Sequence, residues 1–171
     1  MGSNVQQLVD RARVGDKDAF ADLVTTHQRI VYALAYQHAF DKQEAEDIAQ
    51  EAFLRAYRDL RTLRKSDSFT QWLCRITLNV TREKNRARRP FVSLDSLPEM
   101  AAKSDPQEEA EIARLMVMVS DLPEEYRVPL TMRYIEGMSY RDIAEALHIE
   151  ESSARSRVHR ARAMLREQTD S

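Results

Sequence analysis

Charged side chains gather in three runs of this 171-residue chain, and the chemistry they offer is the binding of opposite charge. Residues 41–51 hold five acids against one lysine, and residues 82–89 hold five bases against one glutamate. Residues 155–166 hold five arginines and no acid. Any one run is best explained as a solvated helix face, and the net charge is only −2. Local fields nevertheless attract phosphates or charged partners, so three runs beside the patterns described below indicate binding surfaces.

Catalytic and metal-binding patterns are absent from the sequence. Three glycines cannot form a glycine-rich phosphate loop, and four histidines show no ligand spacing with cysteine or glutamate. Glu44, Asp47 and Glu51 share a helix face but lack the Glu-x-x-His partner of a di-metal bundle. The single Cys74 has no nearby histidine, so we interpret it as a semi-exposed structural thiol. We therefore expect no enzymatic activity, no cofactor and no metal.

Composition favours an all-helical protein in a reducing compartment. Only three glycines and five prolines occur, which favours long helices over turn-rich β architecture. No segment reaches the roughly 20 apolar residues of a membrane span, and no secretory signal opens the chain. One cysteine excludes an internal disulfide. We expect a cytoplasmic protein with no stable membrane insertion.

Apolar residues recur at helical spacing along most of the chain. The spacing predicts helices over about residues 4–13, 16–39, 41–60, 67–89, 108–121, 123–135, 139–147 and 152–167. Asp41 is expected to cap the third of these, with Glu44 as its capping-box partner, and Asp67 or Ser68 the fourth. Residues 91–107 lack any period and contain two prolines, so we interpret them as a linker. The expected domains are residues 1–90 and 108–171.

The last two helices form a predicted helix-turn-helix, in which Ser139 caps the first helix and Ser152 or Ser153 the second. Four apolar side chains of the last helix would pack inward: Ala154, Val158, Ala161 and Leu165. Polar side chains project from the opposite face and its flank: Ser152, Arg155, Ser156, His159 and Arg160. Donors near the start of such a helix suit the major groove, where arginine pairs with guanine or phosphate. An arginine-rich surface helix is the alternative, but the joint pattern favours DNA binding.

Residues 140–162 closely resemble the DNA-reading region of bacterial sigma factors of the extracytoplasmic-function group. The shared pattern is Ser-Tyr-x-x-Ile-Ala followed by Ser-Arg-x-x-Arg-Ala-Arg, which this chain carries at residues 139–144 and 156–162. The resemblance implies that the outward face of the last helix recognises the promoter −35 element. His148 stands where the family usually has glycine in the turn, and histidine tolerates the left-handed conformation better than most residues.

The acidic third helix carries a second pattern. Asp47, Gln50, Glu51 and Leu54 align at three- and four-residue spacing, and acids beside an exposed leucine suit docking onto a basic helix. Taken alone, this pattern is better explained as an ordinary solvated face. The segment strongly resembles the sigma-factor helix that binds the coiled coil of the polymerase β′ subunit. That resemblance implies these polymerase contacts: Asp47, Gln50, Glu51, Leu54 and Arg55.

The fourth helix begins with aromatic residues and ends with basic ones, a mixture that suits unstacked bases and a backbone held by arginine. The alternative is that Phe69 and Trp72 are core residues, and for Phe69 that explanation is the better one. The resemblance assigns this helix to opening and reading the −10 element, with residues 64–68 accepting a flipped base. It implies these DNA contacts: Ser68, Phe69, Trp72, Arg75, Asn79, Arg82 and Arg86. Arg86, Arg88 and Arg89 would hold phosphates.

The resemblance covers roughly residues 5–167, with both motif blocks in the family's order. It implies a factor that binds core RNA polymerase through β′ and β and directs promoter-specific transcription. It also implies an anti-sigma factor that holds the chain inactive until a stress signal. Two alternatives remain open: a stand-alone helix-turn-helix regulator such as a response-regulator output protein, and a protein-binding adaptor whose arginine helix docks on an acidic protein. The regulator would not need the acidic helix followed by the aromatic-basic helix.

Overall fold

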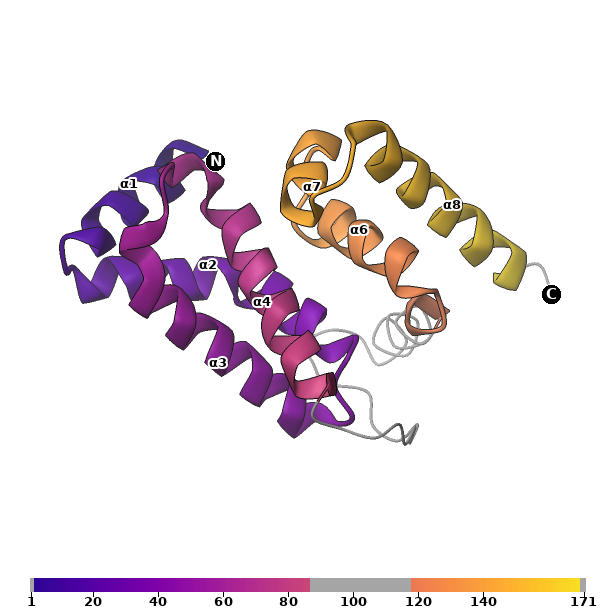
Figure 1. Ribbon diagram of the computed structural model, residues 1–171, viewed down its shortest axis with the longest axis horizontal. Helices are drawn as coiled ribbons and strands as arrows, with labels where there is room; N and C mark the ends of the chain where they lie inside the picture. Colours follow the sequence, from indigo (N-terminus) through magenta and orange to yellow (C-terminus); the bar gives the residue numbers. More distant parts are fainter. Residues whose placement is uncertain (1, 87–117, 170–171) are drawn as a thin grey trace, which may run out of the picture. The chain divides into compact units, whose positions relative to one another are not determined.

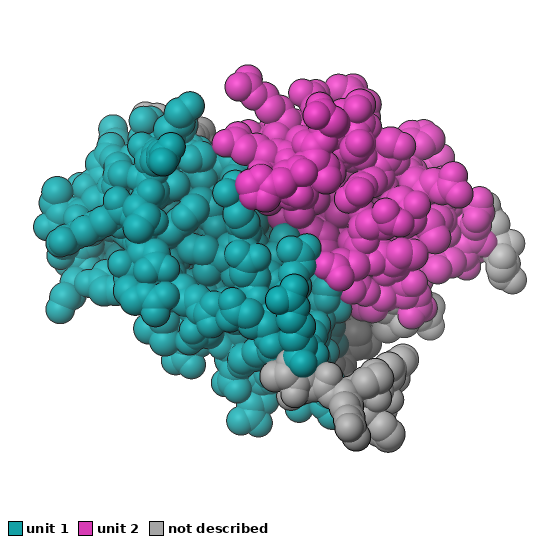
Figure 2. Space-filling view, in the orientation of Figure 1, with its two compact units in different colours: residues 1–93 teal, residues 94–171 magenta. Residues whose placement is uncertain are grey.

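The structure is a computed structural model that describes residues 2–86 and 118–169, and every element in these two ranges is helical. The chain divides into two compact units, residues 1–93 and 94–171 (Figure 2). The all-helical fold class is confirmed. The expected linker, most of the expected helix over residues 108–121, and Arg88 and Arg89 lie outside the described residues. Within the described ranges, no helix is long and apolar enough to cross a membrane.

Unit 1 is a bundle in which α2 packs against α1, α3 and α4 (Figure 1). Its elements are α1 (Gly2–Arg13), α2 (Lys17–Tyr36), α3 (Lys42–Asp59), the 3-10 helices η1 (Leu60–Thr62) and η2 (Ser66–Ser68), and α4 (Phe69–Arg86). Gly15, with φ of +101°, ends the first helix in a conformation that costs glycine little. Asp16 then caps α2 by accepting a hydrogen bond from the Ala19 amide at 3.0 Å.

The start of α3 differs slightly from the expected capping box. Asp41 accepts a hydrogen bond from the Glu44 amide at 2.8 Å, as expected of the cap residue. The Glu44 carboxylate, however, accepts from the Phe40 amide at 2.6 Å, one residue before the cap. The Glu44 carboxylate therefore satisfies an amide outside the helix, and the Glu44 side chain is buried.

The titratable side chain of His27 in α2 is buried in the core of unit 1, beside the start of α4. The His27 ring approaches the Leu23 carbonyl through Nδ1 at 2.9 Å and the Thr70 hydroxyl through Nε2 at 3.0 Å. It meets Phe69 edge-on with ring centroids 5.1 Å apart. Burial lowers the pKa of His27, because the interior disfavours the charged imidazolium; the bond to the Leu23 carbonyl opposes that shift.

Two side chains of α4 are more deeply buried than the sequence predicts. Phe69 is fully buried, so its expected contact with DNA is wrong and the core alternative holds. Cys74 is also fully buried, which corrects its interpretation as semi-exposed. Both side chains lie on the apolar stripe of α4, where burial of aromatic and aliphatic surface stabilises the bundle.

Unit 2 contains the helix-turn-helix, with α8 packed against both α6 and α7. Its elements are α6 (Glu124–Ile135), α7 (Tyr140–Leu147) and α8 (Glu151–Thr169). A buried cluster holds α6 to α8: Leu122, Leu130, Val158 and Ala161. Ser139 and Asp142 form a complete capping box at the start of α7, which confirms that prediction. Pro123 lies one position earlier than expected, at the cap of α6 rather than in its first turn.

The turn between α7 and α8 depends on His148. Its φ of 54° and ψ of 47° are left-handed, and the Ile149 amide closes the turn onto the Ala144 carbonyl at 3.0 Å. The next helix begins earlier than predicted, at Glu151, because the Glu150 carbonyl already accepts from the Ala154 amide at 3.0 Å. The expected cap at Ser152 or Ser153 is therefore wrong, and Ser152 lies inside the first turn.

Candidate functional site

The acidic face of α3 is exposed, as its spacing predicts. The opposite face buries Ala45, Ile48, Ala52 and Ala56 against the rest of the bundle. Asp47 and Gln50 are exposed, and Leu54 leaves 60% of its surface exposed. An isolated exposed leucine is ordinary, but here it lies beside carboxylates on a rigid helix. This face therefore has the features of a docking surface for a basic partner.

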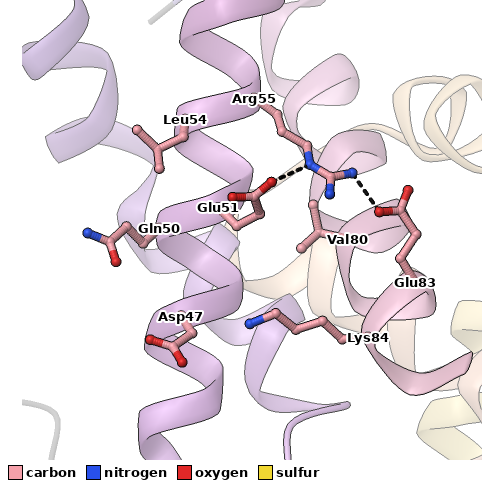
Figure 3. Close-up of a pocket in the computed structure, with 8 residues that line it drawn as sticks. All are labelled: Asp47, Gln50, Glu51, Leu54, Arg55, Val80, Glu83 and Lys84. Carbon is pink, nitrogen blue, oxygen red and sulfur yellow. Dashed lines mark hydrogen bonds and ion pairs between the residues drawn. The ribbon is translucent and has the colours of Figure 1, made fainter. Parts of the chain in front are cut away.

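A surface pocket of about 310 Å³ lies between this face and α4 (Figure 3). All five residues expected to contact polymerase line it: Asp47, Gln50, Glu51, Leu54 and Arg55. Three residues of α4 that the sequence did not single out complete the lining: Val80, Glu83 and Lys84. Of these three, only Glu83 stands out in the sequence, because it is the single acid of the basic run at residues 82–89. Periodicity within one helix cannot tell which residues of its neighbour it faces.

Arg55 bridges the two walls of this pocket. Its Nε lies 2.7 Å from Glu51 Oε1 on α3, and its Nη1 lies 2.7 Å from Glu83 Oε2 on α4 (Figure 3). The hydrogen bond to Glu51 and then that to Glu83 raise the pKa of Arg55, because both stabilise the charged guanidinium. The carboxylates are 40% and 55% exposed, so each pair contributes at most about 1 kcal/mol. The bridge mainly orients the side chains of the pocket.

A second surface follows α4. Trp72, Arg75, Asn79, Arg82 and Arg86 recur at three- and four-residue intervals, so they form one stripe along the helix. Asn79, Arg82 and Arg86 are exposed, whereas Trp72 and Arg75 are half-buried. This stripe combines an accessible aromatic side chain at one end with guanidinium groups toward the other. Such a surface can stack an unpaired base and bind a phosphate backbone.

The segment before α4 is anchored to α1. Ser66 is buried, and its hydroxyl donates to Asp10 Oδ1 at 2.5 Å. Arg13 donates to the Ser66 hydroxyl at 3.4 Å and also to the Leu63 carbonyl. Ser68, expected to contact DNA, is half-buried and donates to the Lys65 carbonyl at 2.8 Å. The segment that we expect to accept a flipped base is therefore a turn held by α1.

The outward face of α8 carries every side chain expected there. Five polar residues of this face are exposed: Ser152, Arg155, Ser156, His159 and Arg160. Ala154, Val158 and Ala161 are buried on the opposite face, and Leu165 is half-buried against the same core. Helical periodicity predicts that Arg157 and Arg162 lie toward the core side of α8. Arg157 is half-buried and 4.0 Å from Glu125, but Arg162 is exposed, so the prediction is wrong for Arg162.

Comparison with known proteins identifies the family. Residues 23–90 match the family model described as Sigma-70 region 2, and residues 110–165 match that of Sigma-70, region 4. RNA polymerase sigma-H factor of Pseudomonas aeruginosa is 37% identical over 94% of this chain and 91% of its own length. ECF RNA polymerase sigma factor SigW of Bacillus subtilis is 31% identical over 96% of each chain. The chain belongs to the extracytoplasmic-function sigma factors. As a member of this family it is a non-enzymatic transcription initiation factor.

Solved structures agree with the fold of this sigma factor. CnrH, solved in complex with the cytosolic domain of CnrY, has a TM-score of 0.76 at 26% identity and covers 98% of this chain and 97% of its own. The sigma factor RpoE of Bartonella quintana, solved with the anti-sigma factor NepR, has a TM-score of 0.72 at 21% identity and covers 88% and 96%. Because both sigma regions match in order, neither a stand-alone helix-turn-helix regulator nor an adaptor describes the chain.

Proposed function

We propose that this sigma factor uses its three surfaces for three separate tasks in transcription initiation. The α3–α4 pocket binds the β′ subunit of core RNA polymerase, with β as a further contact. The stripe on α4 binds the −10 element, and the outward face of α8 binds the −35 element. The observation that supports this division best is the pocket, because all five residues expected to contact polymerase line it together.

The charges suit each proposed partner. Asp47 and Glu51 offer carboxylates beside the apolar Leu54, and a basic partner helix with an apolar ridge would complement both. On α4 and α8 the exposed cations suit a polyanion, whose backbone supplies much of the affinity in protein–DNA binding. Arg155 lies near the start of α8, where a recognition helix contacts base edges, and Arg160 is exposed near the middle of the same helix.

In vitro transcription with purified core polymerase tests the whole assignment. The full chain should direct initiation from a defined promoter, selected from a template library randomised over the upstream region. No promoter-dependent product with active core polymerase would refute the proposal.

Paired arginine substitutions separate the two DNA surfaces. Arg160→Ala should abolish preference for the −35 sequence, whereas Arg166→Ala, an exposed arginine near the end of α8, should preserve it. Arg82→Ala should weaken binding to the single-stranded −10 element within the holoenzyme, whereas Arg58→Ala on α3 should not. Equal effects within either pair would mean that net charge alone, and not position, determines promoter binding.

An inhibitory anti-sigma factor is the further partner we propose, released by a stress signal. The complex of the fold relative RpoE with an anti-sigma factor, and that of CnrH with a cytosolic domain, motivate this proposal. Affinity purification of the chain from its native cells, before and after stress, should yield a partner that excess core polymerase displaces. Recovery of polymerase alone under both conditions would contradict it.

We also propose that residues 1–90 and 108–171 act as separate domains joined by residues 91–107, in the cytoplasm where polymerase and promoter DNA lie. Limited proteolysis of the full chain should cut first within residues 91–107 and leave two resistant fragments. Initial cleavage within α3 or α8 would contradict this boundary.

A further inference from the structure

Tyr140, the first residue of α7, lies next to two arginines from the neighbouring helices of unit 2. The guanidinium carbon of Arg133 on α6 lies 5.0 Å from the centroid of its ring, and that of Arg155 on α8 lies 4.9 Å away. Both distances are within the range at which a cation is attracted to the face of an aromatic ring. One ring therefore contacts the recognition helix and the helix that supports it.

The ring itself is firmly held. Ser139 and Asp142 fix the backbone on either side of Tyr140 through the capping box, and the half-buried ring packs against the core cluster. Arg133 is fixed as well, because its Nη1 donates to the Met138 carbonyl at 2.7 Å. Tyr140 is thus a rigid support, whereas Arg155 is a long side chain on the exposed face of α8.

Arg155 also forms an ion pair with Glu151 on its own helix, at 3.2 Å. The two side chains are 64% and 51% exposed, and an ion pair so open to solvent holds an arginine only loosely. The ring of Tyr140 adds a second, geometrically separate restraint on the same guanidinium. An arginine that is ordered before binding loses less rotamer freedom when it meets DNA.

We propose that Tyr140 is a positioning residue for promoter recognition: its ring holds the Arg155 guanidinium where that group contacts one base pair of the −35 element. This inference rests on the proposed role of α8 in reading the −35 element. It adds a specificity determinant outside the recognition helix. A cation–ring contact at an exposed site corresponds to roughly a two- to fivefold change in affinity.

The competing explanation is that Tyr140 is only a core residue. Three variants distinguish the two roles. Tyr140→Phe keeps the ring, Tyr140→Leu keeps apolar packing but removes the ring, and Tyr134→Leu is a matched control, because Tyr134 is 61% exposed on α6. Arg155→Ala and the double variant Tyr140→Leu/Arg155→Ala complete a double-mutant cycle, which isolates the coupling between the two side chains.

The experiment measures −35 preference with holoenzyme reconstituted from full-length chains, using a promoter library randomised at the −35 element. Tyr140→Leu should reduce the preference for the favoured base by about two- to fivefold. The reduction should occur at the one or two −35 positions where Arg155→Ala also reduces that preference. Tyr140→Phe and Tyr134→Leu should match the wild type. In the double variant, removal of the ring should add nothing to the loss caused by Arg155→Ala.

Two results would overturn the inference while leaving the proposed function intact. One is a Tyr140→Leu profile that equals the wild type, or that weakens every −35 position uniformly as a packing defect would. The other is an effect of Tyr140→Leu that persists in the Arg155→Ala background. A wild-type holoenzyme without any −35 preference would instead refute the proposed reading by α8, and this inference with it.

Discussion

Substitution of Leu54 by alanine probes the α3–α4 pocket at its most exposed apolar side chain. Full burial of a leucine side chain contributes about 1.5–3 kcal/mol. Leu54 is 60% exposed in the free chain, which leaves about 1–2 kcal/mol for a partner to gain by covering it. Alanine keeps only the β-carbon, so we expect Leu54→Ala to weaken binding to core polymerase by about five- to thirtyfold.

Stability should not change, because substitution of an exposed residue usually alters the free energy of unfolding by less than about 0.5 kcal/mol. Urea unfolding followed by the fluorescence of Trp72, the single tryptophan, checks this for unit 1. The assay is competition between unlabelled variants and labelled wild type for core polymerase at fixed salt. Val14→Ala is the matched control, since Val14 is 84% exposed and lies outside the pocket.

Competition by Leu54→Ala within twofold of the wild type would refute the assignment of the pocket to polymerase. An equal loss for Val14→Ala would refute it as well, because general apolar exposure would then explain the binding.

Three features inside the two units give further predictions: the hydrogen bond from Arg13 to Ser66, the Ser139 cap of α7 and the buried His27. Arg13→Ala removes the charged donor to Ser66, so it should lower the free energy of unfolding of unit 1 by about 1–3 kcal/mol in urea titrations read by Trp72; an unchanged midpoint would contradict this. Ser139→Ala removes the cap of α7 and should cost about 1 kcal/mol, seen as a lower melting temperature of unit 2 by circular dichroism; an unaltered melt would show that the cap is dispensable. The pKa of His27 in the folded chain is below the usual histidine value of 6.5, so when the pH falls below 6.5 the unfolded chain binds a proton at His27 more readily than the folded chain does. Stability should therefore hold above pH 6.5 and fall as the pH is lowered below 6.5, and His27→Gln should remove that decline; a decline of the same slope in the variant would assign it to other groups.

Local signals predicted the helices well. Asp41 and Ser139 cap their helices as predicted, because a capping side chain bonds to an amide only a few residues away. Helix ends were less predictable. Helix α2 ends at Tyr36, three residues before the predicted end at residue 39. The His38 amide there donates to the Ala35 carbonyl at 3.1 Å, which forms a tighter turn than an α-helix. At α8 two serines suggested a cap, but the Glu150 carbonyl starts the helix first.

Helical periodicity describes one helix at a time. It therefore predicted which side chains face outward, but it could not predict which residues of other elements they contact. Helical periodicity places Asp47 and Leu54 on one face of α3 without reference to any other element. The contacts that organise the surfaces instead join residues distant in sequence, as Ser66 and Asp10 do across 56 positions. Phe69 shows the converse limit: its residue type suits both base stacking and a core, and only the packing of α2 against α4 decides between them.

The Arg55 bridge explains how the pocket can accept the proposed basic partner without disturbing α4, the helix proposed to bind DNA. A cation that approaches Glu51 competes with Arg55 for the same carboxylate, and a pair so exposed contributes at most about 1 kcal/mol. Arg55 keeps its second pair with Glu83, so the connection to α4 survives the exchange. The two helices are held together by buried apolar side chains, which the exchange does not expose. Docking can therefore replace one weak ion pair by another while the stripe on α4 stays in place.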